Sequence, residues 1–421
     1  MSVLWPGIIA VALTLGAGVC NADVASGSEA FYVSGFGTLG VSQLDQPAGW
    51  AYTRNADQAT NTSQLRADLD SRIGLQLNYR PADQFELVTQ VVASRLPAGD
   101  GVSGALELAL AAYRPDANWT VRVGRVNMDA YLLSDHRDVG FTYEYVRPPV
   151  EFYSRMPTSL DGGDISRVWT FADVQWRAKL FGGRASAGAG SGLIVLSPLV
   201  GVMVSRESDG LLLRVSLVHT ELPSTPTAEQ PLDAALLALD ALPVPAVVAQ
   251  ANALANDLTY DRTTTNFIAA GAQYDRNNWL FTAEINHIQI NQHSESSVTS
   301  GYASFGRRFG PVSVFGLESA VIRSGSALAT PDWATPLALL GPAVAQQAQY
   351  LASVATLAAN EQAGHQHTTS VGARWDLSAS LALKTQWDHV QTNANGGEVW
   401  GMATAQAGVA NIFTVTLDFV F

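Results

Sequence analysis

Hydrophobic and polar side chains alternate over long stretches of this chain. Between residues 65 and 79 the odd positions are apolar, apart from Ser71, and the even positions are polar, charged or glycine. The same period of two returns at residues 279–286, 381–389 and 413–421. Because successive side chains of a β-strand point to opposite faces, the pattern predicts strands with one apolar and one polar face.

Two features favour a membrane-spanning barrel over a soluble sandwich with similar alternation. The predicted strands are roughly 9–15 residues long, and a tilted strand needs about 9–11 residues to span the bilayer. Their apolar faces end in aromatic residues beside short turns, namely Tyr79, Tyr113, Trp119, Tyr274 and Trp279. Aromatic residues at one depth form a girdle at the membrane interface. The pattern therefore predicts an all-β fold, a transmembrane antiparallel β-barrel.

The spacing of turns sets the number of strands. Short turns are predicted near residues 81–84, 115–118, 180–183, 206–210, 275–278, 309–311 and 377–380. Loops of variable length are predicted near residues 45–63, 96–104, 127–162, 192–197, 222–262, 291–297, 324–365 and 393–410. These connections join about 16 strands, an even number as in bacterial barrels, with all the short turns on the periplasmic side. The strand at 192–206 has the weakest pattern, and without it and a neighbour about 14 strands would remain.

Composition and charge narrow the class of protein further. Among 421 residues, 47% are hydrophobic and 14% are charged, and the net charge is −13. An acidic chain without a basic patch is unsuited to nucleic acid, so no nucleic-acid partner is expected. A single cysteine excludes a disulfide scaffold and a thiolate metal cluster.

The first 22 residues have the character of a secretory signal peptide. They carry no charge, and an apolar stretch is followed by small residues up to Ala22, where cleavage is expected. The barrel domain would then be residues 23–421. Acylation at Cys20 is the alternative, although Val19 is bulky for such a site. The uncharged stretch 185–205 is long enough for a membrane helix, but its glycines and Pro198 favour two strands.

Three segments together resemble the general porins of Gram-negative bacteria. They are the opening strand at residues 31–40, the second strand at 66–79, and the closing strand at 413–421 with its terminal phenylalanine. The resemblance implies a homotrimer in the outer membrane, in contact with lipid and lipopolysaccharide. It also implies that the barrel assembly machinery recognises the last strand through Phe413, Phe419 and Phe421. The long alanine-rich loops and the signal peptide without Lys or Arg near Met1 depart from the family pattern.

The family also places a constriction loop after the fifth strand, folded into the lumen, and residues 127–162 occupy that position here. The charged residues of this candidate loop are Asp129, Asp135, Arg137, Asp138, Glu144, Arg147, Glu151 and Arg155. By resemblance, acids on the loop would face wall arginines and create a transverse field across the pore. The alternative is an external loop packed on its own aromatic residues.

Charged residues on the polar face of the strands are candidates for lining the pore. A channel selects solutes by its radius and by charged rings at its narrowest part. The candidates are Arg66, Asp68, Asp70, Arg72, Arg122, Arg214, Arg374, Lys384 and Asp388. The alternative is that they are ordinary polar residues of a water-filled interior.

Two alanine-rich insertions interrupt the strand pattern, within the loops 222–262 and 324–365. Residues 233–240 and 337–360 contain mostly good helix formers, apart from Gly341 and Pro342. These segments would cap the mouth, narrow the vestibule or contact a neighbour. Loosely ordered surface loops are the alternative.

Motifs for catalysis or for binding a cofactor are absent from the sequence. It contains no nucleophile elbow, phosphate-binding loop or HExxH motif, so neither an enzyme nor a cofactor is expected. His365 and His367 would share one strand face, but no third metal ligand is indicated, and no metal is expected. Asp388 and His389 are adjacent, which on a strand directs them to opposite faces and prevents a catalytic dyad.

The sequence therefore predicts a water-filled channel for passive diffusion of small hydrophilic solutes and ions. A solute-selective channel is the first alternative, with Arg66, Arg72 and Arg122 favouring anions. A hydrolase with its site on the barrel rim and a closed barrel that acts in adhesion or anchoring are the others.

Overall fold

The computed structural model describes residues 30–55, 58, 61–94, 105–154, 156–189, 192–223, 230–259, 263–291, 297–360, 363–398, 400–401 and 407–421. The predicted signal peptide, residues 1–22, and Arg155 of the candidate constriction loop lie outside these residues.

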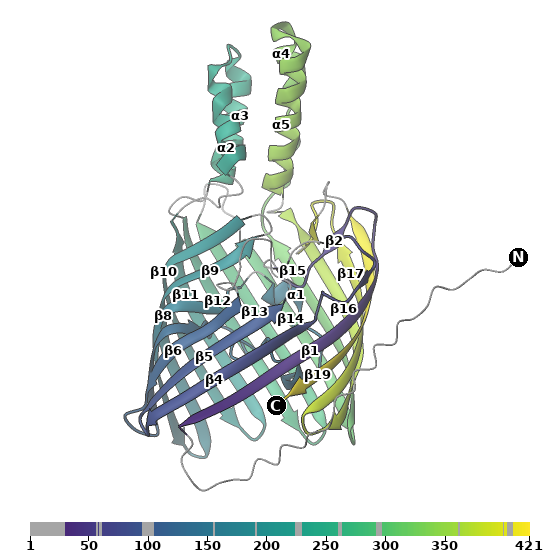
Figure 1. The fold of residues 1–421 in the computed structure, drawn as a ribbon. Coiled ribbons are helices and arrows are strands. Elements are labelled where there is room, and N and C mark those ends of the chain that lie inside the picture. The colour runs from purple at the N-terminus through teal and green to yellow at the C-terminus, as the bar shows by residue number, and fades with distance from the viewer. Residues whose placement is uncertain are drawn as a thin grey trace, which may run out of the picture.

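Sixteen long antiparallel strands form a closed barrel (Figure 1), which confirms the predicted fold class. The first eight are β1 (Phe31–Asp45), β4 (Arg72–Ala82), β5 (Phe85–Ser94), β6 (Leu106–Tyr113), β7 (Trp119–Asn127), β8 (Ser159–Phe171), β9 (Val174–Ala189) and β10 (Gly192–Ser208). The others are β11 (Leu211–Leu222), β12 (Thr263–Arg276), β13 (Trp279–Asn291), β14 (Ser297–Phe309), β15 (Val312–Arg323), β16 (His365–Ser378), β17 (Leu381–Thr392) and β19 (Gly408–Val420). The barrel closes because β1 pairs with β19 on one side and with β4 on the other. The short β3 (Leu65–Arg66) also pairs with β1, and β2 (Ala51–Tyr52) pairs with β18 (Trp400–Gly401).

The two faces of the strands differ as the alternation predicts, but the second predicted strand, 66–79, is interrupted, because residues 67–71 lie between β3 and β4 and are not in a strand. On β4, Ile73, Leu75 and Leu77 are exposed on the outer wall, whereas Arg72 and Asn78 are buried on the inner face. Aromatic rings of neighbouring strands stack at the end with the short turns, such as Phe31 on Tyr79, with ring centroids 4.3 Å apart. The predicted aromatic girdle is therefore present.

One predicted turn is wrong. Residues 180–183 lie inside β9, and the turn between β8 and β9 is at Ala172 and Asp173, whose φ angles are 49° and 61°. Both residues adopt the left-handed conformation of a tight hairpin turn, although neither is glycine. Gly182 and Gly183 instead pair with Gly163 and Gly162 of β8. A Cβ at Gly162 or at Gly183 would lie 2.1 or 2.2 Å from a backbone oxygen of the other strand, too close for a side chain.

The loop predicted at 192–197 is also misplaced, because these residues belong to β10. Only residues 190–191 separate β9 from β10. The strand with the weakest sequence pattern is thus real, and the number of strands holds.

The segment between β7 and β8 folds into the barrel, and Figure 1 shows its helix α1 inside. We call residues 128–158 the inward loop. It contains η2 (Gly140–Thr142) and α1 (Val150–Tyr153) and follows the fifth long strand, as predicted. It ends earlier than the predicted boundary at 162, because β8 begins at Ser159.

The alanine-rich insertions form helices that project from the end of the barrel with the long loops (Figure 1). The first contains α2 (Gln230–Leu237), η3 (Ala238–Ala241) and α3 (Pro245–Leu258). The second contains α4 (Ala334–Leu337), η4 (Ala338–Leu340) and α5 (Pro342–Asn360), with a break at Gly341, whose φ is 111°. We call these helices the tower. They share a core that includes Leu236, Val247, Trp333 and Ala352. In the part of the chain that the structure describes, no helix is both long and apolar enough to cross a membrane.

Candidate functional site: the inward loop and the space beside it

The backbone of the inward loop is bound by side chains of the barrel wall. Lys384 on β17 donates hydrogen bonds from Nζ to the carbonyl oxygens of Gly140 at 2.5 Å and Tyr145 at 2.8 Å. Two residues further along the strand, Oε1 of Gln386 accepts a hydrogen bond from the Val146 amide at 2.9 Å. Gly140 lies so close to the wall that a Cβ would be 2.1 Å from Oδ1 of Asp418, so this contact requires glycine.

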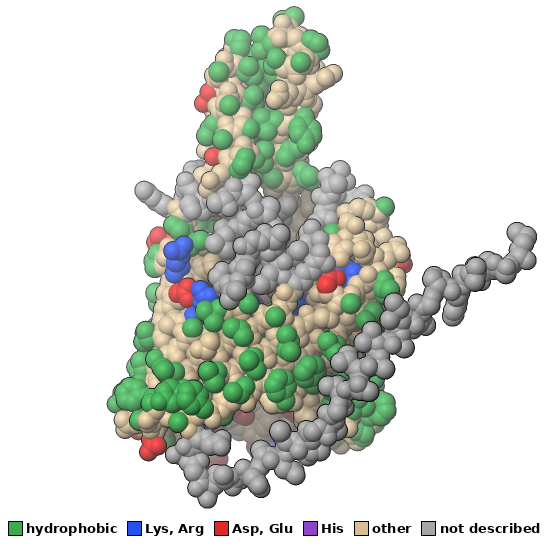
Figure 2. Space-filling view, viewed as in Figure 1, with side chains coloured by type: hydrophobic (Ala, Val, Ile, Leu, Met, Phe, Trp, Pro, Cys, Tyr) green, Lys and Arg blue, Asp and Glu red, His purple; other side chains and the backbone are tan. Residues whose placement is uncertain are grey.

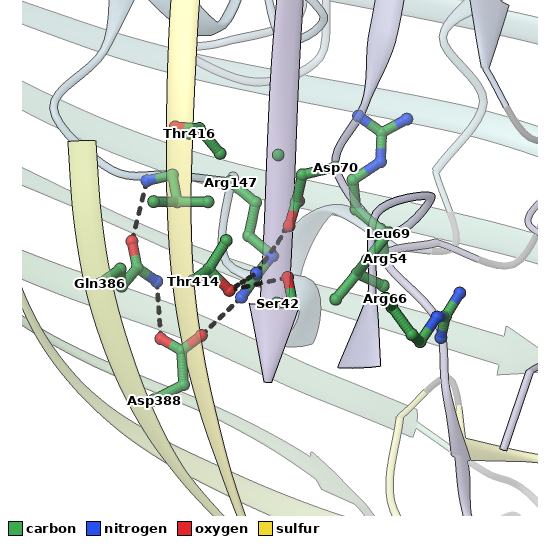
Figure 3. A network of polar contacts seen from close by, with 12 residues as sticks. Ser42, Arg54, Arg66, Leu69, Asp70, Arg147, Gln386, Asp388, Thr414 and Thr416 are labelled. Carbon is green, nitrogen blue, oxygen red and sulfur yellow. Dashed lines mark hydrogen bonds and ion pairs between the residues drawn. The ribbon is translucent and has the colours of Figure 1, made fainter. Parts of the chain in front are cut away.

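Arg147 is the centre of a buried ion-pair network (Figure 3). Its Nε and Nη2 donate to the two carboxylate oxygens of Asp70 at 3.0 and 2.7 Å. Its Nη1 donates to Oδ2 of Asp388 on β17 at 2.5 Å, and its Nη2 also donates to Thr414 on β19. These groups are almost inaccessible to solvent. The paired carboxylates raise the pKa of Arg147 well above its ordinary value, although burial acts in the opposite direction.

Asp129, near the start of the loop, forms ion pairs with basic residues of β9 and β11. Asp129 pairs with Nζ of Lys179 on β9 at 2.6 Å and with Nη1 of Arg214 on β11 at 2.7 Å. Burial alone would raise the pKa of Asp129, but Arg214 and Lys179 lower it below its ordinary value. The carboxylate therefore stays ionised at neutral pH.

Two buried glutamates complete these attachments. Glu284 on β13 accepts hydrogen bonds from the Leu132 amide at 2.8 Å and from the hydroxyls of Tyr302 and Tyr153. On the loop, Glu151 accepts hydrogen bonds from Ser319, Gln366 and Thr368 of strands β15 and β16.

Aromatic rings fill the space between the loop and this part of the wall. Phe152 lies edge-to-face against Tyr131 and Tyr302, with centroid distances of 4.7 and 5.4 Å, and Tyr145 packs in the same way on Phe315 at 5.7 Å. Such pairs stabilise packing by about 0.5–1.5 kcal/mol each beyond the area they bury. The loop is therefore packed against much of the barrel wall.

Most of the predicted wall residues are in contact with the inward loop. Arg72 donates to Asp138 O and to the Tyr143 hydroxyl, Arg374 to the carbonyl oxygens of Phe141 and Tyr143, and Arg214 to that of Tyr131. Arg66 is buried on β3 and forms an ion pair with Asp68. Arg122 forms an ion pair with Asp164 on β8, away from these contacts. The assignment of these residues to the lining of a pore stays a prediction.

Other charged residues of the loop also form direct contacts with neighbouring groups. Asp135 accepts from Asn127, Arg137 donates to Met156 O, Asp138 is 3.8 Å from Arg54, and Glu144 accepts from Ser313. Ion pairs of both polarities join the loop to its surroundings, since Arg147 of the loop binds Asp70 and Asp388, whereas Asp129 of the loop binds Lys179 and Arg214 on the wall. The transverse field implied by the resemblance stays a prediction.

A cavity of about 290 Å³ lies inside the barrel. It lies over β4 to β7, where paired residues such as Asn78, Val88, Leu110 and Gly124 share the inner face. Its polar lining is Tyr32, Gln76, Asn78, Arg80, Glu86, Arg114 and Arg122, and its apolar lining is Val88, Leu108, Leu110 and Ala112.

Sequence reasoning identified only Arg122 among the charged residues of this cavity. Glu86 accepts hydrogen bonds from Asn78 at 2.9 Å and from Arg114 at 2.7 Å, and Arg80 is within 3.2 Å of it. Arg80 and Arg114 directly follow the girdle residues Tyr79 and Tyr113, so both appeared to belong to turns. The alternation was the available signal. Arg80 is two residues after inward Asn78, and Arg114 is two residues after Ala112, which pairs with inward Glu86.

The histidines on the strands lie outside this arrangement. Asp388 binds Arg147 inside the barrel, whereas His389 is 2.9 Å from Asn411 on the outer wall, so the predicted opposite orientation is correct. His367 pairs with Glu318 and His365 contacts Arg323 O. Among the described residues, no group of three or more side chains is arranged to hold a metal ion.

The C-terminal strand closes the barrel. Phe421 exchanges backbone hydrogen bonds with Gly35 at 2.8 and 2.9 Å, and Phe413 and Phe421 are exposed on the outer wall. The rings of Phe419 and Phe421 stack at 6.4 Å. The role of these residues in assembly stays a prediction.

Comparison with known proteins places the chain by fold. No protein-family model matches it. No curated protein sequence matches it either. Solved structures do match. The outer-membrane channel DcaP of Acinetobacter baumannii has a TM-score of 0.52 at 9% identity, over 94% of this chain and 99% of that one. An anion-selective porin from Comamonas acidovorans has a TM-score of 0.50 at 11% identity, over 93% and 100% of the two chains. The trimer form of OmpT of Vibrio cholerae has a TM-score of 0.50 at 10% identity, over 93% and 100%. The chain is therefore a porin-like transmembrane β-barrel.

Proposed function

We propose that this protein is an outer-membrane porin, a channel through which small hydrophilic solutes and ions diffuse passively. The observation that carries the proposal is the cavity over β4 to β7, whose lining includes charged and amide side chains. A barrel of about 16 strands leaves an aqueous channel in its interior unless it is filled. Solutes would pass between the loop and the strands β4 to β7.

The same proposal includes the location and assembly of the protein. The chain would be exported through a signal peptide to the outer membrane of a Gram-negative bacterium. There it would contact lipid and lipopolysaccharide and form a homotrimer. The likeness in fold to OmpT of Vibrio cholerae, an outer membrane protein described in a trimer form, supports this assembly.

Single-channel recording in a planar bilayer tests the proposal. Purified, folded protein should insert in steps, and a trimer should give three sub-levels of current. The reversal potential in a KCl gradient then gives the sign of ion selectivity. Folded protein that inserts without current contradicts the proposal.

The tower supports a second candidate, in which the barrel anchors a binding surface. Leu339 in η4 is 98% exposed and Tyr350 in α5 is 73% exposed. Figure 2 shows hydrophobic side chains spread over the visible face of these helices. Silent insertion, together with cell-surface binding that is lost when the tower helices are removed, would favour this candidate over the channel.

A further inference from the structure

Part of the wall of the cavity over β4 to β7 is apolar. The interior of a transmembrane barrel with an aqueous lumen is normally polar. Here Val88 of β5 and Leu108, Leu110 and Ala112 of β6 all line the cavity. Val88 pairs with Leu110 and Ala112 pairs with Arg122, so the apolar stripe directly adjoins a guanidinium group.

Charge in the same cavity favours anions. Among the described residues, three arginines, Arg80, Arg114 and Arg122, form ion pairs with two carboxylates, those of Glu86 and Asp164. The side chains of Arg80 and Arg114 are 54% and 42% exposed, whereas that of Glu86 is 4% exposed. The positive groups are therefore the ones that a solute meets. Guanidinium groups bind carboxylates well, because their planar donors match both oxygens.

We propose that this cavity binds small organic anions with an apolar body, of the class of aromatic monocarboxylates. The carboxylate would contact Arg114 and Arg122, and the apolar body would lie on Leu108 and Val88. The cavity of about 290 Å³ accommodates a solute of that size. This inference rests on the proposed channel function and adds to it the class of solute.

Block of the KCl current in planar bilayers measures such binding with four related probes. Benzoate has both features, acetate lacks the apolar body, benzyl alcohol lacks the charge, and benzylammonium has the opposite charge. Benzoate should block at the lowest concentration of the four. If all four block equally, the inference is wrong.

Two variants separate the features of the site. In the double variant Arg122→Gln/Asp164→Asn the net charge is unchanged and no carboxylate is left unpaired. It should raise the half-blocking concentration of benzoate by about ten-fold, as expected for loss of one charge-assisted hydrogen bond. Leu108→Ser should weaken block by benzoate and leave block by acetate unchanged. Arg167→Gln is the control, because Arg167 lies on the same strand as Asp164 but packs on Trp119 outside the barrel. Wild-type block by benzoate in both test variants would overturn the inference.

A binding measurement keeps this test independent of conduction. Line broadening of fluorobenzoate in the ¹⁹F spectrum, with folded protein in detergent micelles, reports occupancy even if the barrel carries no current. Binding to a silent barrel would contradict the channel function alone. Current without any preference for benzoate would contradict the solute class alone.

Discussion

Arg147, in the middle of the inward loop, and Asp70, two residues before β4, form a two-pronged ion pair inside the barrel, with N–O distances of 3.0 and 2.7 Å. The two residues are 77 positions apart in the chain, and neither is exposed to solvent. A second carboxylate, that of Asp388, binds the same guanidinium from β17. The loop is thus bound to residues on both sides of β1. Asp70 precedes β4, which pairs with one edge of β1, and Asp388 is on β17, which pairs with β19 at the other edge.

Removal of this arginine should release the loop. The Arg147→Met variant leaves Asp70 and Asp388 buried without their partner, which costs about 3–5 kcal/mol. We expect a lower temperature of unfolding in detergent and noisier single-channel current. The triple variant with Asp70→Asn and Asp388→Asn should recover most of the stability, because no uncompensated charge remains.

Arg276→Met is the matched control for this prediction. Arg276 pairs with Asp209 at 3.6 Å, and both side chains are exposed. Exposed pairs contribute about 0–1 kcal/mol, so the unfolding temperature should hardly change. Equal effects of Arg147→Met and Arg276→Met would contradict the role given to the buried network.

The barrel was predictable from sequence because the alternation of apolar and polar residues is visible within each strand, without knowledge of its neighbours. On β4 the alternation of residues 72–79 depends only on local geometry and on the lipid outside. Residues 67–71 continue the same pattern but are not in a strand, and Leu69 and Asp70 are both buried. The contacts of Arg147 could not be obtained in this way, since its partners come from distant strands. The turn at Ala172 and Asp173 was missed because the glycines near residues 180–183 were interpreted as the turn. Glycines that permit close pairing of β8 and β9 have the same local signature as glycines in a turn.

Acid should loosen the inward loop through His136. Burial lowers the pKa of His136 below its ordinary value of 6.5, with a further decrease from Arg214, and nearby Asp135 and Asp129 oppose the shift. A released loop would bind a proton near pH 6.5, whereas the packed loop binds it only at lower pH. Stability is therefore lost as pH falls below about 6.5. Asp129 stays ionised in this range, because its pKa is lowered.

Current recordings at pH 7.5 and pH 5 check this dependence. Closures or current noise should increase at pH 5 in the wild type, and His136→Gln should remove most of the increase. The same acid response in His136→Gln would show that other groups are responsible.

Gly201 should not tolerate a side chain. It pairs with Phe181 across β9 and β10, and a Cβ at Gly201 would lie 2.2 Å from the end of the phenylalanine ring. Phe181 is only 1% exposed, so its ring has no free space to enter. We expect Gly201→Ala to destabilise the barrel by about 1–3 kcal/mol, the usual cost of overpacking. Gly316→Ala on β15 is the control, since the nearest atom to its Cβ is 4.0 Å away. Thermal unfolding that is equal for both variants would contradict the prediction.

Trp333 should stabilise the tower without affecting the channel. Its side chain is fully buried, and its Nε1 donates to Gln250 of α3 at 2.8 Å, while Gln349 of α5 accepts from its backbone amide at 2.8 Å. It therefore links the two insertions. Trp333→Ala should cost the tower about 3–5 kcal/mol, the usual cost of truncating a buried aromatic residue.

Limited proteolysis of the folded protein and single-channel conductance should then respond differently to Trp333→Ala. Cleavage within the insertions should become faster, while conductance stays at its wild-type value, because the core of the tower is separate from the aromatic cluster around the inward loop. Tyr350→Ala, at an exposed position of α5, should change neither measurement. A fall in conductance with either variant would instead mean that the tower helices narrow the entrance of the channel.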